Sequence, residues 1–409
     1  MKTVQDAVPL EFERARQIVI ETVRSIAGPR ATEVISLRQA HGRVLANSVP
    51  ADRDYPALRR SLRDGFAVKS ANLPGVLKIR GEVRAGEAEQ APLEDGEALE
   101  IMTGAPVPDG ADAVVMVEHV ERLSDANGAQ YMKSDRPAEP CQFINPCGAE
   151  AQLGGVLIPA GTRLDASHIA TLAMVGQSSV EVLMRPSVAI LATGDEIVDL
   201  NVVPAVHQIR NSNSYMLAAL VEASGACPNI LPVARDTTAT LRPLLEQGLQ
   251  HDLLLVSGGV SAGKYDLVKP TLRNLGATFH FERVRIQPGQ PTAFGTVGNK
   301  PVFGLPGNPG SSLVTYQLFA RPALDLLSGE RDPVLPLLSA QFEAPFRHKP
   351  GLTRFLPARL NADGQHLIHI PWQGSSDVPA LAKANAFLVA DHDRESWGIG
   401  DSIRVMCKL

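Results

Sequence analysis

Residues 252–263, DLLLVSGGVSAG, contain an apolar run that ends in a glycine-rich loop, and this pattern decides the fold of the surrounding region. The same order of apolar run and polar corner occurs in SVAILATGDE at 187–196 and in KPVFGLPGNPG at 300–310. Stretches with helical spacing of apolar residues follow, for example SNSYMLAALVEASG at 212–225. Repetition of strand, loop and helix predicts a doubly wound, mostly parallel α/β domain over residues 181–330.

The flanking regions have a different pattern. Residues 11–26, EFERARQIVIETVRSI, predict an amphipathic helix within an N-terminal helical and linker domain made of 1–44 and 146–180. Short apolar runs between Gly, Pro and Asp turns predict a β-rich, barrel-like second domain over 45–145. Similar runs predict a small all-β, barrel-like C-terminal domain over 331–409. The predicted fold class is therefore a multidomain protein that combines α/β and β domains.

Composition excludes several classes of function. The chain of 409 residues has 39 basic and 44 acidic side chains, and its net charge of −5 argues against a dedicated nucleic-acid binder. No apolar run approaches the roughly 18 residues that span a bilayer, and the first residues lack a signal-peptide core. We therefore expect a cytoplasmic protein without a membrane partner. The four cysteines form no CxxC pair, which argues against a disulfide framework or a zinc site.

The loop after the 252–257 run nearly matches a nucleotide-binding P-loop. Tyr265 stands where that motif has a Ser or Thr that binds Mg²⁺, so the sequence argues against a P-loop ATPase. Glycines still allow backbone N–H groups to approach an anion at the start of a helix. We therefore predict phosphate binding at this loop, with a plain tight turn as the alternative.

Acidic residues follow the strands of the same region. Glu196, Asp236 and Asp266 lie just past three of the predicted strands, and carboxylates beside a phosphate loop suit Mg²⁺. The alternative is helix capping or ordinary solvated acids. Ligands of parallel sheets bind at the carboxyl ends of the strands. We therefore expect the TGDE, SGGVSAG and LPGNPG corners to form one acid-lined pocket that accepts an anion.

Several motifs resemble those of a known family, the molybdopterin molybdenumtransferases, and of the similar C-terminal domain of gephyrin. The motifs are RDGFAV at 63–68, IMTGAPVPDGADAVV at 101–115, ATGDEIVD at 192–199, SGGVSAGKYDLVK at 257–269 and VFGLPGNPGSS at 302–312. The resemblance implies molybdenum cofactor biosynthesis, in which adenylylated molybdopterin and molybdate, with Mg²⁺, give molybdenum cofactor and AMP. It also implies a homodimer whose site combines the α/β and C-terminal domains of one chain with the second domain of the other. The enzyme that produces adenylyl-molybdopterin is implied as a protein partner.

The resemblance also assigns roles to individual residues. It implies four catalytic acids, Asp64, Glu196, Asp236 and Asp266, of which Glu196 and Asp236 hold the metal. The remaining matched positions are implied to bind the pterin nucleotide or the oxyanion. They are Thr103, Glu150, Ser257, Gly258, Gly259, Ser261, Gly263, Gln287, Pro288, Gly289, Gln290, Pro306, Gly307, Asn308, Pro309, Ser311 and Ser375.

One segment departs from the family pattern. The usual KPGKP is QPGQP here, so Gln287 and Gln290 replace two lysines that help to hold molybdate. Each ammonium group beside a dianion contributes attraction on the order of 4 kcal/mol at an effective dielectric constant near 20, whereas an amide only donates hydrogen bonds. Molybdate binding is therefore weaker, moved onto arginines, or lost. One alternative function is a pterin-binding paralogue with impaired molybdate insertion, and another is an interaction scaffold.

Arginines expected near the start of the C-terminal domain are also missing. Leu352 and Pro357 stand at the positions where the family has arginine. Arg354 and Arg359 lie nearby but out of register with those positions. The sequence leaves open which arginine compensates for the lost lysines.

Overall fold

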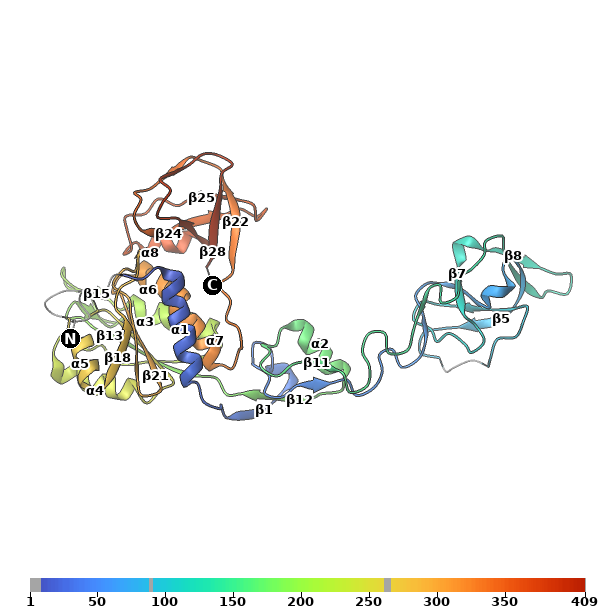
Figure 1. The fold of residues 1–409 in the computed structure, drawn as a ribbon, viewed down its shortest axis with the longest axis horizontal. Coiled ribbons are helices and arrows are strands. Elements are labelled where there is room, and N and C mark those ends of the chain that lie inside the picture. The colour runs from blue at the N-terminus through green and yellow to red at the C-terminus, as the bar shows by residue number, and fades with distance from the viewer. Residues whose placement is uncertain (1–8, 88–90, 261–265, 409) are drawn as a thin grey trace. The chain divides into compact units, whose positions relative to one another are not determined.

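The structure is a computed structural model, and it describes residues 9–87, 91–260 and 266–408 (Figure 1). The chain splits into two compact units. The α/β region and the C-terminal β region both lie in the first unit. The first unit comprises Met1–Ala46, Gly161–Asp165 and Ser179–Leu409, and the second comprises Asn47–Ala160 and Ala166–Ser178.

A six-stranded sheet forms the centre of the first unit. In spatial order its strands are β16 (Cys227–Ile230), β13 (Ser187–Ala192), β17 (Leu253–Ser257), β21 (Lys300–Leu305), β20 (Ala293–Val297) and β18 (Ala277–Phe281). The first four strands are parallel, and β20 and β18 are antiparallel to their neighbours. The prediction of a mostly parallel sheet is therefore confirmed. Strand β16 ends at Ile230, and Pro232, which lacks an N–H, interrupts the ladder there. The Leu231 and Ala234 N–H groups still donate to carbonyl oxygens of β13.

Helices cover both faces of this sheet (Figure 1). One face packs against α1 (Phe12–Ile26), α3 (Ser212–Ala223) and the continuous run α6 (Pro309–Thr315), a π-helical segment (Tyr316–Ala320) and α7 (Arg321–Leu327). The other face packs against α4 (Thr238–Gly248) and α5 (Val268–Asn274). Successive side chains of a strand point to opposite faces, so Leu253 and Leu255 enter one core while Leu254 and Val256 enter the other. This burial explains why the strand reads as a continuous apolar run.

A closed β-barrel follows the α/β region and is drawn in orange and red in Figure 1. Its strands are β22 (Leu337–Phe342), β24 (Thr353–Leu360), β25 (His366–His369), β26 (Ala386–Ala390) and β28 (Ser402–Cys407). Pairing of β24 with both β25 and β26 closes the barrel. Short elements complete this region: β23 (Phe346–Arg347), β27 (Ser396–Trp397) and α8 (Val378–Lys383). Residues 343–345 form the bend between β22 and β23, and Pro345, which has no N–H for a ladder, lies in this bend.

The second unit is built on another six-stranded sheet. Its spatial order is β7 (Ala113–Met116), β4 (Gly65–Val68), β6 (Glu97–Ile101), β5 (Gly75–Val83), β9 (Gln130–Ser134) and β8 (Glu121–Ser124). Both faces of β4 are buried, because Phe66 and Val68 enter one core while Ala67 enters another. The unit also holds β2 (Val49–Pro50), β3 (Arg60–Ser61), β10 (Ile144–Asn145), β11 (Val156–Ile158), α2 (Ala166–Met174) and the 3₁₀ turns η3 (Ser70–Asn72) and η4 (Val117–His119).

The remaining elements of the first unit are short. They are β1 (Thr32–Ser36), which pairs with β12 (Ser179–Leu183), β14 (Ile197–Val198), which pairs with β15 (Ile209–Arg210), β19 (Ile286–Gln287) and the 3₁₀ turn η2 (Leu37–Gln39). Within the described ranges, no helix has both the length and the apolar character needed to cross a membrane.

Candidate functional site

The three corners predicted to converge meet at the carboxyl edge of the sheet. The Thr193 N–H donates to the carbonyl oxygen of Ser257 at 3.0 Å, which joins the TGDE corner to the glycine loop. The Gly258 N–H donates to the Leu305 carbonyl oxygen at 3.0 Å, which joins the glycine loop to the corner after β21. Backbone hydrogen bonds therefore hold the three corners side by side.

The glycine loop can lie this close to its neighbour only because it lacks side chains. Gly258 has φ of +94°, and a Cβ there would lie 2.7 Å from the backbone oxygen of Thr193. Gly259 has φ of +63°, and a Cβ there would lie 2.8 Å from the Thr193 hydroxyl oxygen. Both the left-handed backbone and the close approach therefore require glycine. Ser261 and Gly263, also predicted to bind phosphate or pterin, lie outside the described residues.

Asn213, at the start of α3, connects two of the corners. Its side-chain amide donates to the Ser257 hydroxyl at 2.8 Å and to the Gly307 carbonyl oxygen at 2.6 Å. Its own carbonyl oxygen is buried and has no hydrogen-bond partner among the described residues. Asn213 therefore positions the glycine loop against the LPGNPG corner. No motif in the sequence predicts this role.

Two of the predicted acids lie near each other at the TGDE corner. The Asp236 N–H donates to a carboxylate oxygen of Asp195 at 3.3 Å. Burial raises the pKa of Asp236, and the nearby Asp195 and Glu196 carboxylates raise it further. Negative charge is therefore concentrated at this corner, although these acids are exposed at the surface.

Asp266 differs from the other acids because it is buried. Only 8% of its side chain is exposed, and neither carboxylate oxygen has a hydrogen-bond partner among the described residues. Burial raises the pKa of Asp266, and the ammonium group of Lys269, 3.4 Å away, opposes this effect. A buried carboxylate with a single charged partner is costly to folding, and such groups are candidates for a functional role.

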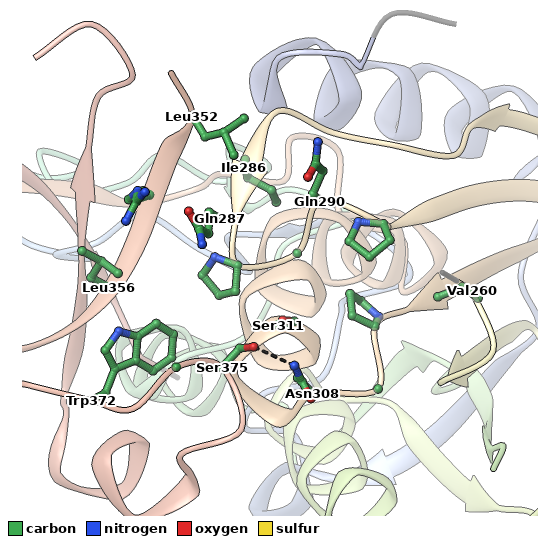
Figure 2. Close-up of a pocket in the computed structure, with 17 residues that line it drawn as sticks. Val260, Ile286, Gln287, Gln290, Asn308, Ser311, Leu352, Leu356, Trp372 and Ser375 are labelled. Carbon is green, nitrogen blue, oxygen red and sulfur yellow. Dashed lines mark hydrogen bonds between the residues drawn. The ribbon is translucent and has the colours of Figure 1, made fainter. Parts of the chain in front are cut away.

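A cavity of about 540 Å³ opens beside the corner after β21 (Figure 2). Its lining includes nine of the predicted substrate-binding residues: Gln287, Pro288, Gly289, Gln290, Pro306, Gly307, Asn308, Ser311 and Ser375. Asn308 donates to the Ser375 hydroxyl oxygen at 2.9 Å, and Ser375 lies on the segment that precedes α8. The cavity is thus formed between the α/β region and the C-terminal barrel of one unit.

The cavity is polar but not acidic, which corrects one expectation. Glu196, Asp236 and Asp266 are not among its described lining residues, and neither are Ser257, Gly258, Gly259 and Pro309. The acids follow β13, β16 and β17 of the central sheet. The cavity instead lies beside β19, which pairs with β24 of the barrel. The carboxyl edge therefore presents two neighbouring surfaces: one is acidic, and the other has amides, hydroxyls and apolar side chains but no carboxylate among its described lining residues.

The remaining predicted residues belong to the second unit. The Asp64 carboxylate accepts hydrogen bonds from the Thr103 N–H at 2.6 Å and from the Thr103 hydroxyl at 2.8 Å. These bonds lower the pKa of Asp64. Glu150 is exposed and accepts a hydrogen bond from Asn145 at 3.1 Å. Asp64 and Thr103 therefore form one ordered polar pair on an exposed surface.

Comparisons with known proteins identify the family. Three family models match in order along the chain: MoeA N-terminal region (domain I and II) over 10–176, probable molybdopterin binding domain over 189–326, and MoeA C-terminal region (domain IV) over 339–407. A molybdopterin molybdenumtransferase from Bacillus subtilis is 32% identical over 385 residues, which cover 92% of this chain and 89% of that protein. The chain belongs to the molybdopterin molybdenumtransferase family. A member of this family from Nostoc is 36% identical over 323 residues, covering 76% of this chain and 73% of that protein.

Solved structures agree with this assignment. Two crystal structures of a molybdopterin biosynthesis MoeA protein from Pyrococcus horikoshii each cover 98% of this chain and 100% of their own. Their TM-scores are 0.72 and 0.78, at 29% and 26% identity. The predicted fold class and the resemblance to the molybdopterin molybdenumtransferases are thus confirmed.

The predicted metal ligands are a pair of acids. In the described ranges, no group of three or more His, Cys, Asp or Glu side chains is arranged to hold a metal ion. Glu196 and Asp236, predicted as metal ligands, lie close enough for Glu196 to raise the pKa of Asp236. Two carboxylates of this kind suit Mg²⁺, which completes its coordination with water and substrate phosphate oxygens.

Proposed function

We propose that this chain inserts molybdenum into molybdopterin, using adenylylated molybdopterin and molybdate and releasing AMP, as a Mg²⁺-dependent transferase. The observation that carries the proposal is the junction of the glycine loop, the acidic corner and the amide- and hydroxyl-bearing cavity at one edge of the sheet. The names of the family's curated members support it. We also propose a cytoplasmic location and the predicted domain ranges 1–44 with 146–180, 45–145, 181–330 and 331–409.

The glycine loop would bind the phosphates of the pterin nucleotide. Ser257 offers a hydroxyl and Gly259 a backbone N–H, while the Gly258 N–H already donates to Leu305. Neither Gly258 nor Gly259 has a side chain that would block an approaching phosphate. Ser261 and Gly263, which lie outside the described residues, are also proposed to bind the phosphates or the pterin. Asn213 would keep this surface aligned with the LPGNPG corner through its two hydrogen bonds.

The acidic corner would hold Mg²⁺ through Glu196 and Asp236. When bound, Mg²⁺ neutralises charge on the phosphates and on the AMP that departs. Asp266 adds buried negative charge next to the glycine loop. The chain itself contributes positioning and electrostatic stabilisation, and no covalent bond to a side chain is needed.

The cavity beside the LPGNPG corner would hold the oxyanion next to the pterin. The amides of Gln287, Gln290 and Asn308 and the hydroxyls of Ser311 and Ser375 supply its hydrogen-bonding groups. Pro288, Gly289, Pro306 and Gly307 shape the cavity wall, and Pro309 begins the helix that carries Ser311.

Molybdate-dependent release of AMP tests the proposed function. The purified chain, incubated with adenylylated molybdopterin and Mg²⁺, is expected to release AMP when molybdate is added, as measured by chromatography. Glu196→Gln should lower the rate at least about tenfold, because it removes one charge of the metal site. Tight binding of the adenylylated pterin without molybdate-dependent AMP would instead favour the impaired paralogue, which the glutamines at 287 and 290 make the second candidate.

The second unit would complete the site across a homodimer. On this proposal Asp64, Thr103 and Glu150 of one copy act with the acidic corner of the other. Mixing the impaired Asp64→Asn and Glu196→Gln chains should then raise activity above that of either variant alone, because each mixed dimer has one intact site and one doubly altered site. Random exchange predicts recovery to about a quarter of the wild-type rate.

Sedimentation of each variant alone provides the control that both still dimerise. Absence of recovery in a mixture shown to contain mixed dimers would contradict the shared site. The enzyme that produces adenylyl-molybdopterin is proposed as a transient partner that delivers the substrate.

A further inference from the structure

The cavity next to the LPGNPG corner holds a single ionisable side chain among its described lining residues. That residue is Arg354, and the other lining residues are amides, hydroxyls, glycines, prolines or apolar side chains. A tetrahedral dianion that enters such a cavity loses part of its hydration shell. Neutral donors replace hydrogen bonds but not charge, so a cation in the cavity strengthens its binding of a dianion.

Backbone pairing brings Arg354 to the QPGQP turn. Strand β19 pairs with β24 in parallel, and in this register Gln287 is the direct partner of Arg354. Direct partners in a sheet project from the same face, so the two side chains leave their strands toward the same side. Both residues accordingly line the cavity. The guanidinium therefore belongs to the surface where the family lysine at position 287 is missing.

Arg354 also lacks the carboxylate partner that three other barrel arginines have. Its Nε is buried without a hydrogen-bond partner, and no described carboxylate forms an ion pair with it. By contrast, Arg347, Arg394 and Arg404 each pair with a carboxylate. A buried donor left unsatisfied is costly, and a ligand that accepts its hydrogen bonds removes that cost.

We propose that Arg354 binds the tetrahedral oxyanion in this cavity and supplies the positive charge that Gln287 and Gln290 do not. This inference rests on the proposed function for the identity of the anion as molybdate. The planar guanidinium donates two hydrogen bonds to two oxygens of the anion, a geometry that an ammonium group does not reproduce. The hydroxyls and amides of the cavity donate to the remaining oxygens.

Calorimetric titration of the full chain with molybdate, without pterin, tests the proposal. Arg354→Gln is expected to weaken binding about 10- to 100-fold, because a charge-assisted hydrogen-bonded pair is lost. The molybdate affinity of Arg354→Lys should lie between those of the wild type and Arg354→Gln. Lysine keeps the positive charge but cannot donate the two parallel hydrogen bonds of a guanidinium. Tungstate should follow molybdate across the variants, whereas the smaller sulfate tests whether any tetrahedral dianion is accepted.

Arg359→Gln is the matched control. Arg359 lies five positions further along β24, so it projects from the opposite face of that strand, and it is exposed. Its replacement should leave molybdate affinity unchanged. Equal affinity of wild type and Arg354→Gln would overturn the proposal, and so would an equal loss in Arg359→Gln.

A rescue variant separates charge from folding. Adding Gln287→Lys to Arg354→Gln returns a cation to the register partner, and binding should recover at least about tenfold. A folded double variant without recovery would overturn the proposal. If thermal unfolding shows that Arg354→Gln does not fold, Arg354→Lys provides the test. A molybdate affinity of Arg354→Lys equal to that of the wild type would overturn the role of the guanidinium.

The same variants distinguish this inference from the proposed function. Arg354-dependent binding of molybdate without any AMP release by the wild-type chain would contradict the insertion activity and leave the anion site standing. AMP release that persists at the wild-type rate and molybdate requirement in Arg354→Gln would overturn the inference and leave the insertion activity standing.

Discussion

Asp266→Asn is expected to lower molybdate-dependent AMP release about 100- to 1000-fold while leaving the chain at least as stable as the wild type. The loss of activity follows from removing the buried negative charge beside the glycine loop. Stability should be retained or increase because the variant no longer has to bury a charged carboxylate. Such opposite effects on activity and stability are expected where a functional group is costly to bury.

The direction of the stability effect comes from the pKa of Asp266. Burial raises this pKa in the folded chain above that of the unfolded chain. The folded state therefore binds its proton more tightly, and wild-type stability falls as pH rises from the unfolded pKa to the folded pKa. Asp266→Asn has no carboxyl group at this position, so its free energy of unfolding should not decrease in this pH range. The variant should therefore become more stable relative to the wild type as pH increases.

Asp363→Asn provides a control with the opposite sign. Hydrogen bonds from His366 and from two backbone N–H groups lower the pKa of Asp363 to about 2. Its ionised form stabilises the fold at pH values above the unfolded pKa, and that contribution is lost as pH falls through the folded pKa. This variant should lose stability at neutral pH and keep its AMP release. A large loss of stability in Asp266→Asn would show that its main role is structural.

Gly65→Ala is expected to lower the stability of the second unit by more than about 3 kcal/mol. A Cβ at this position would lie 1.9 Å from the carbonyl oxygen of Val115 and 2.8 Å from its carbonyl carbon. These are backbone atoms of β7, which pairs with β4 through Phe66 and Val115. The sheet can make room only by breaking that pairing next to Asp64, so AMP release should fall as well.

Gly81→Ala is the matched control in the same sheet. A Cβ there would meet only a side-chain methyl of Leu99 at 3.8 Å, an ordinary contact. Far-UV circular dichroism should show early unfolding in Gly65→Ala alone. Both tryptophans, Trp372 and Trp397, lie in the first unit, so their fluorescence should report an unchanged transition there. Equal stability of the two alanine variants would contradict the steric argument.

Much of the fold was predictable because local patterns control it. Strand β17 is buried on both faces and therefore reads as an unbroken apolar run, and the glycines that follow it adopt left-handed backbone. The helix α1 was predicted within one residue from its apolar spacing. The family resemblance rested on the corners after β13, β17 and β21, where the chain needs particular residues to turn.

Pairing between distant segments was not predictable in the same way. The sequence places 286–287 in the α/β region, yet β19 pairs with β24 of the barrel and thereby brings Gln287 beside Arg354. Arg354 had appeared out of register with the family arginines, and only the sheet pairing shows which surface it serves. Asn213 likewise has an ordinary position at a helix start, and its bonds to two loops depend on how those loops fold.

The amino-acid order thus determined the strands, the helices, the glycine corners and the family. The tertiary structure decided that the acids and the amide-lined cavity occupy neighbouring surfaces, and that Arg354 is the charge available to the cavity. The physical reason is the distance along the sequence over which each effect acts. Turn chemistry and apolar spacing act over a few residues. The pairing of Gln287 in β19 with Arg354 in β24, 67 residues apart, depends on how the whole unit packs.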